Sequence, residues 1–227
     1  MPVALVNEME ALAKTQRRWN RLREVLNLQR CPCTLTHLYF SKNKFAASGI
    51  ARLSSALCMC RSVQHLELSH CEVSPACGAS LGSMLAENRS LRTLVLSWNR
   101  LGFGVAALAD GLAENRNLET LDLCWNGCGY EDTMFAMSQA LATDSLALRT
   151  LLLAQNRIKP EQAVILADGV QKSVSLRHIS LDGNPLGSMG RLCRLQLQLA
   201  PASVLTPSRP APPPPCQPRH PEGGGSH

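Results

Sequence analysis

A pattern of apolar and polar positions recurs six times along the chain. Each copy has apolar residues at its first, fourth, sixth and eleventh positions, and an asparagine or cysteine at its ninth. Successive copies begin 28, 28, 27, 30 and 28 residues apart, at Leu35, Val63, Leu91, Leu118, Leu148 and Leu176. Six copies in register at a nearly constant period indicate a repeat protein in which every unit folds in the same way.

The pattern predicts one strand and one helix in each unit. Apolar residues at alternate positions put two side chains on one face of a short strand. The second half of each unit has apolar residues four apart, as in Leu108–Leu112 and Leu166–Val170, which is helical spacing. Strands are therefore expected, all parallel in one sheet, over roughly Leu35–Phe40, Val63–Leu68, Leu91–Leu96, Leu118–Leu123, Leu148–Leu153 and Leu176–Leu181.

The asparagine or cysteine at the ninth position falls where the chain turns after the strand. A buried amide or thiol at this point can bond backbone groups of neighbouring units that otherwise lack partners. Neither the strand nor the helix buries its apolar face alone, so the units must stack, with strands inside an arc and helices outside.

The repeats resemble the ribonuclease-inhibitor-like subtype of leucine-rich repeat. The resemblance covers about residues 35–190 and is clearest in Leu85–Leu94 and Leu112–Leu121, which are very like that subtype's consensus. The same subtype occurs in ribonuclease inhibitor, the Ran GTPase-activating protein and the sensor regions of NOD-like receptors. The resemblance implies an α/β fold, a right-handed solenoid or horseshoe with a parallel inner sheet and outer helices.

The function that this resemblance implies is a non-catalytic scaffold that binds a protein partner on its concave face. We expect a monomer that needs no cofactor and binds neither nucleic acid nor membrane. Two alternatives stay open: a regulator of a small GTPase, and a fragment or relative of a NOD-like receptor. The chain has no G-x-x-x-x-G-K-[ST] loop to supply the nucleotide site of such a receptor.

The two ends of the chain lack the repeat. Residues 1–34 are expected to form a helical cap on the array, because Leu12, Trp19, Leu22 and Leu26 are spaced to share one helix face. The array itself is expected over 35–200, with its last unit partial. Nine of the fourteen prolines lie between positions 201 and 221. A segment of this composition cannot offset its ordering entropy, so 201–227 is expected to be a disordered tail.

Charge and composition change this picture little. Hydrophobic residues make up 45% of the chain but aromatics only 4%, so the core must be mainly aliphatic. The net charge of +6 comes from the ends: 1–34 has six Lys or Arg against three acids, and 191–227 has four against one. Residues 35–190 have thirteen of each, so no basic stripe for nucleic acid is expected there. No apolar run is long enough for a membrane helix, and no secretory signal is expected at the start.

The ten cysteines are expected to be reduced thiols in a cytoplasmic protein, because the chain shows no export signal. Two C-x-C pairs lie at nearly the same corner of adjacent units and form a weak candidate zinc site. The alternative is that they are small apolar residues of the core. The candidate ligands are Cys31, Cys33, Cys58 and Cys60.

The inner face of the sheet carries the candidate binding residues. Trp98 and Trp125 occupy the same place in consecutive units and should lie about 4.8 Å apart, as a paired hot spot. The alternative is that aromatic residues at this position only cover the turn between strand and helix. His37, His65 and Glu67 are also neighbours, which suits a polar lining better than a metal site. The other candidate partner-binding residues are Tyr39, Lys42, Glu67, His70, Asp122 and Gln155.

Two short motifs complete the candidates. Gly78–Gly82 fits the G-x-S-x-G nucleophile pattern, but Ser80 falls inside a predicted helix, where close helix packing explains the glycines better. We therefore expect no enzyme activity. Arg209, Pro212 and Pro215 fit R-x-x-P-x-x-P, a weak candidate ligand for an SH3-type domain.

Overall fold

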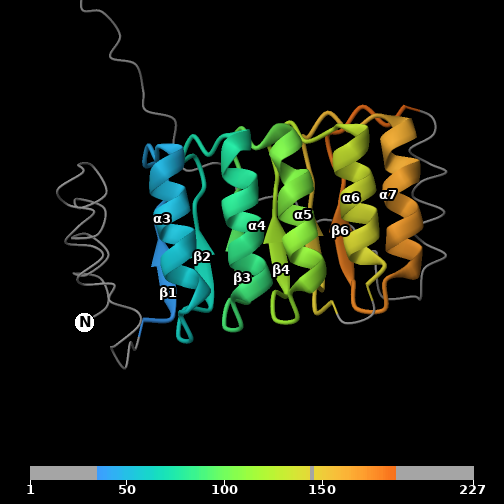
Figure 1. The fold of residues 1–227 in the computed structure, drawn as a ribbon. Coiled ribbons are helices and arrows are strands. Elements are labelled where there is room, and N and C mark those ends of the chain that lie inside the picture. Colours follow the sequence, from blue (N-terminus) through green and yellow to red (C-terminus); the bar gives the residue numbers. More distant parts are fainter. Residues whose placement is uncertain (1–34, 144–145, 188–227) are drawn as a thin grey trace, which may run out of the picture.

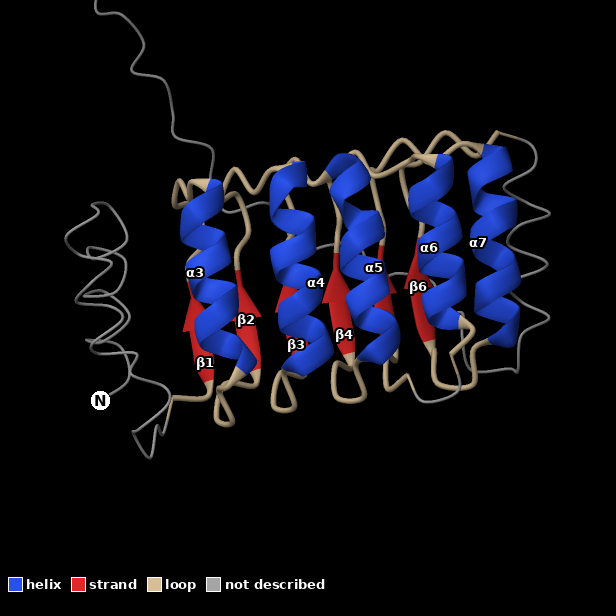
Figure 2. Ribbon diagram, in the orientation of Figure 1, coloured by secondary structure: helices blue, strands red, loops and turns tan. Residues whose placement is uncertain are grey.

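Six parallel strands form one sheet in chain order, and every helix of the described array packs on one side of it (Figures 1 and 2). The computed structural model describes residues 35–143 and 146–187. The strands are β1 (His37–Tyr39), β2 (His65–Glu67), β3 (Thr93–Val95), β4 (Thr120–Asp122), β5 (Thr150–Leu152) and β6 (His178–Ser180). The helices are α3 (Ala47–Cys58), α4 (Gly78–Glu87), α5 (Val105–Glu114), α6 (Glu131–Leu141) and α7 (Pro160–Lys172), with 3-10 turns at Pro75–Cys77 and Gly102–Gly104.

This architecture confirms the predicted α/β leucine-rich-repeat solenoid. The predicted cap, the predicted tail and the last part of the array lie outside the described residues, as do Cys31, Cys33, Arg209, Pro212 and Pro215. Within the described ranges, no helix is both long enough and apolar enough to cross a membrane.

Each strand is shorter than the repeat predicts, with three residues in place of six. The backbone pairing nevertheless continues on both sides of the strands. Before β2, the N–H of Gln64 donates to the carbonyl of Thr36 at 2.8 Å, and after it the N–H of Leu68 donates to Val95 at 2.8 Å. The middle residues of the strands are in exact register, with Leu38 opposite Leu66 and Leu66 opposite Leu94. The repeat therefore predicts the paired segments correctly and overestimates only their regular part.

The core is the aliphatic layer between sheet and helices. Leu66, Leu94 and Leu121, the central residues of β2, β3 and β4, are fully buried, and so are Leu108 and Leu112 of α5. At about 25 cal/mol per Å² of apolar surface, each such leucine contributes roughly 1.5–3 kcal/mol relative to an exposed one. Because the repeat places these residues in columns, the core is continuous along the array.

Glycines allow α4 and α5 to approach each other closely. A methyl group on Gly111 of α5 would overlap the carbonyl of Gly82 on α4, and one on Gly78 would overlap the carbonyl of Gly104. Close helix packing thus accounts for both glycines of the G-x-S-x-G sequence. Ser80 lies within α4, in a shallow groove between α3 and α4 whose described lining residues include no histidine.

Candidate functional site

The ninth-position asparagines build the turns that carry the candidate site. Asn99 is buried, and its amide nitrogen donates to the carbonyls of Leu68 and Leu96, both at 2.8 Å. Its Oδ1 accepts the backbone N–H groups of Cys71 and Val73, at 2.9 and 3.0 Å. One side chain thereby ties the turn of its own unit to the turn of the preceding one, as the sequence predicts.

Asn126, Asn156 and Asn184 repeat this bonding in the units that follow. In the second unit Cys71 takes the same place, where its thiol donates to the carbonyl of Phe40 at 3.0 Å. Thiol and amide thus occupy one ladder, but only the amide offers an acceptor oxygen as well as a donor.

The residue just before the ninth position has left-handed backbone in every described unit. Its φ is +62° at Lys42, +54° at His70, +58° at both Trp98 and Trp125, +59° at Gln155 and +68° at Gly183. A non-glycine residue in this region costs about 1–2 kcal/mol. The conformation persists because it directs each backbone N–H to the next unit, as from Trp98 to the carbonyl of Cys124 at 2.9 Å. We call these six positions the turn column.

Three side chains of the turn column form a stack, which we call the aromatic ladder. The rings of Trp98 and Trp125 have centroids 4.3 Å apart and planes 11° apart. His70 stacks on Trp98 at 5.0 Å and 14°. The indoles nevertheless remain 46% and 43% exposed. The sequence predicts this contact correctly, and the left-handed backbone explains why the rings lie parallel, since consecutive side chains leave identical turns in the same direction.

Lys42 and Gln155 occupy the turn column on either side of the ladder, and both are exposed. The carboxamide of Gln155 fills the space that a side chain at position 183 would need, over Gly183. The ladder is thus flanked by a cation on one side and by an amide on the other. The structure places these predicted binding residues in a single row.

The acidic residues of the inner face already have partners. The Ser41 hydroxyl donates to Glu67 at 2.5 Å, and one Asp122 oxygen accepts the backbone N–H of Cys124 at 2.9 Å. Burial, followed by the nearby Asp122 carboxylate, raises the pKa of the Cys124 thiol to about 12. Cys124 is therefore an uncharged, unreactive part of the floor beside the ladder.

A second ring cluster lies at the first two strands. His37 and His65 stack with centroids 5.5 Å apart, and the Tyr39 ring lies 5.1 Å from His65. Burial and then the His37 charge lower the pKa of His65, against an opposing effect of Glu67. Within the described residues, no three His, Cys, Asp or Glu side chains are arranged to hold a metal ion. The predicted neighbours His37 and His65 do meet, and their role as a polar lining stays a prediction.

The described half of the candidate zinc site divides between two environments. Cys60 is buried in the core and lies 3.6 Å from the Ser62 hydroxyl. Cys58 ends α3 and faces Glu87 of α4, and burial followed by that carboxylate raises its pKa to about 11. In the protein without metal, this environment keeps Cys58 as the protonated thiol. Zinc ligation by these cysteines stays a prediction.

The sequence reasoning missed a set of exposed aromatic residues on the helix side. Phe103, Tyr130 and Phe135 are 64%, 49% and 57% exposed. Phe103 and Tyr130 touch edge to face, with centroids 6.3 Å apart. They lie outside the strand segments, where the repeat pattern places the binding residues. The available signal was their departure from the Ala and Pro found at similar places in the other units.

Comparison with known proteins agrees with the repeat geometry. A family model described as Leucine Rich repeat matches residues 60–81 and 87–102. The chain is a leucine-rich repeat protein. It is 36% identical over 130 residues, 56% of its length, to human NACHT, LRR and PYD domains-containing protein 5, of which the match spans 11%. The repeat protein thus resembles a small part of a much longer relative.

Solved structures also resemble the leucine-rich repeat array. Leiomodin-1 Actin-Binding Site 2 superposes with a TM-score of 0.51 at 15% identity, covering 78% of this chain and 85% of that one. A tropomodulin C-terminal domain from Caenorhabditis elegans gives a TM-score of 0.49 at 14% identity, covering 78% and 89%. At this identity the likeness to leiomodin is one of fold alone.

Proposed function

We propose that the chain is a non-catalytic scaffold that binds a protein partner on its inner, concave face, anchored by the aromatic ladder. The observation that carries the proposal is the parallel stack of Trp98 and Trp125 at 4.3 Å, with both rings almost half exposed. Tryptophan is enriched among the residues that dominate binding energy. Stacking and the hydrogen-bonded turns hold the rings in place before a partner arrives, which limits the entropy lost on binding.

The surroundings of the ladder support this role. Ser69, Ser97 and Ala154 are small residues of the inner face beside it, and the Ser69 and Ser97 hydroxyls lie 3.1 Å apart. A partner segment can therefore approach the indole edges without meeting large side chains. Lys42, Gln155, Tyr39, Glu67 and Asp122 supply polar contacts around this floor in the proposed interface.

The similar proteins do not identify the partner. The family is built of binding modules, and one fold neighbour is named for an actin-binding site. Because that likeness is one of fold, it supports protein binding in general and carries no argument for actin. The match to a NACHT, LRR and PYD protein favours a relative of NOD-like receptors over a GTPase regulator. We also propose a cytoplasmic, monomeric protein, in which thiols such as Cys71 and Cys128 serve as core residues.

The test compares the full chain with a Trp98→Ala/Trp125→Ala variant in quantitative affinity purification, followed by titration of the recovered partner. Loss of both rings should weaken partner binding at least about tenfold, since a hot spot is worth roughly 2–4 kcal/mol. Glu114→Lys, on the exposed end of α5, is the matched control and should bind as the wild type does. A partner lost with Glu114→Lys but retained without the tryptophans would move the interface to the helices.

A further inference from the structure

Most of the described aromatic residues of this array are exposed on its surface, and few are buried in its core. The chain has four Phe, three Trp and two Tyr, so they are scarce. In the part that the structure describes, only Phe40 and Phe45 are buried. The remaining described aromatics are 40–64% exposed: Tyr39, Trp98, Phe103, Trp125, Tyr130 and Phe135. Aromatic side chains ordinarily supply core and interface energy, and here the core does not use them.

Half of the exposed aromatic residues lie on the helix side of the array, opposite the aromatic ladder on the sheet side. Tyr130 directly precedes α6 and lies over Gly102, with its Cε2 3.7 Å from where a side chain there would begin. Phe135 is on the first half of α6. The equivalent position on the neighbouring helix α7 is occupied by Val164, which is 43% exposed. We call Phe103, Tyr130, Phe135 and Val164 the outer patch.

The equivalence of Phe135 and Val164 follows from the buried positions. Counted from Met134 of α6 and from Ala163 of α7, buried residues follow at the same spacing, three, four, six and seven positions later. The residue after each, Phe135 or Val164, is exposed. Neighbouring helices in such a layer lie about 8–10 Å apart. The outer patch therefore extends from the turn before α5 to the outer face of α7, with Phe103 and Tyr130 in contact, and exposed apolar side chains gathered in this way mark an interaction site.

The exposed charges on the three helices of the outer patch, α5, α6 and α7, are nearly all acidic. The acids on the three helices are Asp110, Glu114, Glu131, Asp132, Glu161 and Asp168, all exposed. The one basic residue within the same helices, Lys172, is paired with Asp168 at 2.7 Å. The balanced count of thirteen acids and thirteen bases in residues 35–190 thus conceals a separation in space.

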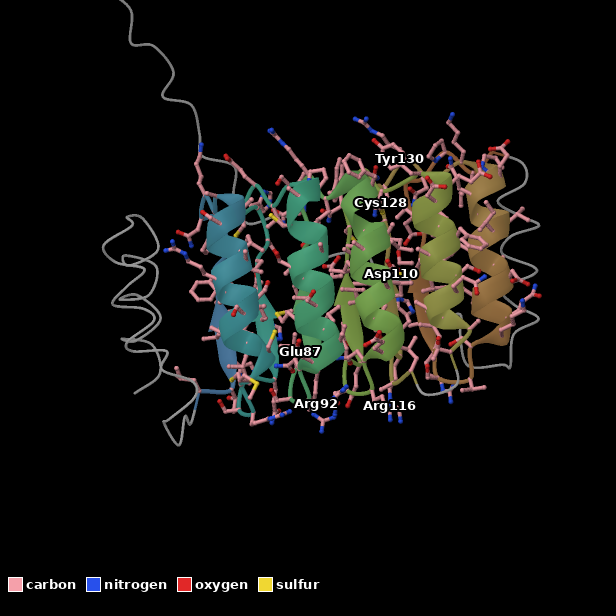
Figure 3. The ribbon with its side chains drawn as sticks, in the orientation of Figure 1. Glu87, Arg92, Asp110, Arg116, Cys128 and Tyr130 are labelled. Atoms are coloured by element: carbon pink, nitrogen blue, oxygen red, sulfur yellow. The ribbon has the colours of Figure 1, made fainter. Side chains whose placement is uncertain are left out.

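Figure 3 shows this separation: Tyr130 lies at the strand-to-helix edge of the array, Asp110 over α5, and Arg92 and Arg116 at the opposite edge. Three exposed bases, Arg100, Arg157 and Lys159, are in the turns that precede α5 and α7, at the same edge as Tyr130. A cationic partner on the outer patch would therefore turn its charged side chains toward α5, α6 and α7 and away from these turns.

From the aromatic anchors and the acidic surround we propose that the outer patch is a second docking surface, which binds a basic amphipathic segment of another protein. The apolar stripe of such a segment covers Phe103, Tyr130 and Phe135, and its Lys or Arg side chains face Asp110, Glu131 and Asp132. A helix with i, i+3, i+4 apolar spacing and a basic flank has this chemistry. The surface is independent of the aromatic ladder on the sheet side.

The test uses the full chain and a labelled peptide of about 18 residues made of Lys and Leu at helical spacing, followed by fluorescence anisotropy in about 0.15 M salt. Saturable binding is expected for the wild type. Phe103→Ala/Tyr130→Ala/Phe135→Ala should weaken it at least about tenfold, and Asp110→Asn/Glu131→Gln/Asp132→Asn should weaken it and reduce its salt dependence. A Glu and Leu peptide of the same pattern should not bind.

Matched controls locate the effect. Trp98→Ala/Trp125→Ala removes aromatics from the other side of the array, and Val174→Ala removes an exposed apolar residue outside the patch; both should leave peptide binding unchanged. Because the patch residues are exposed, circular dichroism should show every variant folded. Binding that survives the triple aromatic change would be charge attraction alone and would overturn the proposal, as would no binding by the wild type.

Two further outcomes would assign the surface to a different occupant and also overturn the proposal. A peptide of residues 4–29 that displaces the Lys and Leu probe at lower concentration would make the occupant this chain's own segment. Light scattering that shows a dimer in the wild type and a monomer in the triple aromatic variant would make it a second copy.

Discussion

The ninth-position asparagines should contribute strongly to stability, because one asparagine side chain forms hydrogen bonds in two units. In Asn99→Ala, the N–H groups of Cys71 and Val73 lose their shared acceptor and the carbonyl of Leu68 loses its donor. The carbonyl of Leu96 keeps a second donor, the Asn126 amide, at 2.9 Å. Each buried polar group left without a partner costs about 1–3 kcal/mol. With the two N–H groups near the low end of that range and the one carbonyl below it, the variant should lose about 2–4 kcal/mol.

A graded series tests the cause of that loss. Asn99→Cys copies the natural arrangement at Cys71, whose thiol donates to Phe40 but offers no equivalent acceptor. It should therefore recover only part of the loss, about 1–2 kcal/mol. Among the described residues, Asn43 donates only to carbonyls of its own unit, Phe40 and Ser41. Asn43→Ala should cost only about 1 kcal/mol.

Urea unfolding followed by circular dichroism, with the slope fitted for each variant, measures these differences. The expected order of stability is wild type, Asn43→Ala, Asn99→Cys and Asn99→Ala. If Asn99→Ala fell within about 1 kcal/mol of Asn43→Ala, the bonds between units would not stabilise the array. Equal losses for Asn99→Cys and Asn99→Ala would show that the thiol at this position acts only as a space-filling group.

Three shorter predictions concern the core, the helix layer and pH. Leu94→Asp buries an unpaired charge and should prevent folding, which the loss of far-ultraviolet dichroism would reveal. Gly111→Ala, ordinarily favourable in a helix, should instead destabilise by about 1–3 kcal/mol, because the methyl overlaps α4; exposed Ser83→Ala is its neutral control. The lowered pKa of His65 means that its contribution to stability is present above its ordinary pKa of 6.5 and lost as pH falls below it. Urea midpoints at about pH 7.5 and 5.5 should therefore differ less in His65→Asn than in the wild type.

The period of the sequence was enough to predict the fold, because each apolar column has a single way to be buried. Leu66, Leu94 and Leu121 stand in register at the positions that the repeat assigns to them. The same period placed Trp98 and Trp125 side by side. Sequence alone did not show the left-handed turn column, since Trp, Lys and Gln are not residues that favour positive φ. Only Gly183 and His70 hinted at it.

The charge separation and the outer patch were missed for a different reason. Charges were counted by segment, whereas a repeat of about 28 residues distributes them by position in the unit. Arg61, Arg89 and Arg116 share one position and line the helix-to-strand edge, while the acids follow the helices. Asn88 and Asn115 were likewise read only as part of a consensus. Both are buried. Their amide nitrogens donate to carbonyls at the end of the helix in the preceding unit, those of Leu57 and Leu85, at 2.6 Å.

Both proposed surfaces depend on the same two units, the third and fourth. Trp98 and Phe103 belong to the third, and Trp125 and Tyr130 to the fourth, on opposite sides of the turns that the asparagines hold. Helices α4 and α5 pack closely where Gly82 meets Gly111, whereas α3 and α4 leave a groove between them.

In a solenoid, stability is set by each unit and its interfaces with its neighbours. Exposed anchors are most useful where those interfaces are tightest, because a rigid anchor loses least entropy on binding. Hydrogen exchange should therefore find the amides around Asn99 and Asn126 among the slowest in the array. Rapid exchange there would remove the preorganisation on which both surfaces rely.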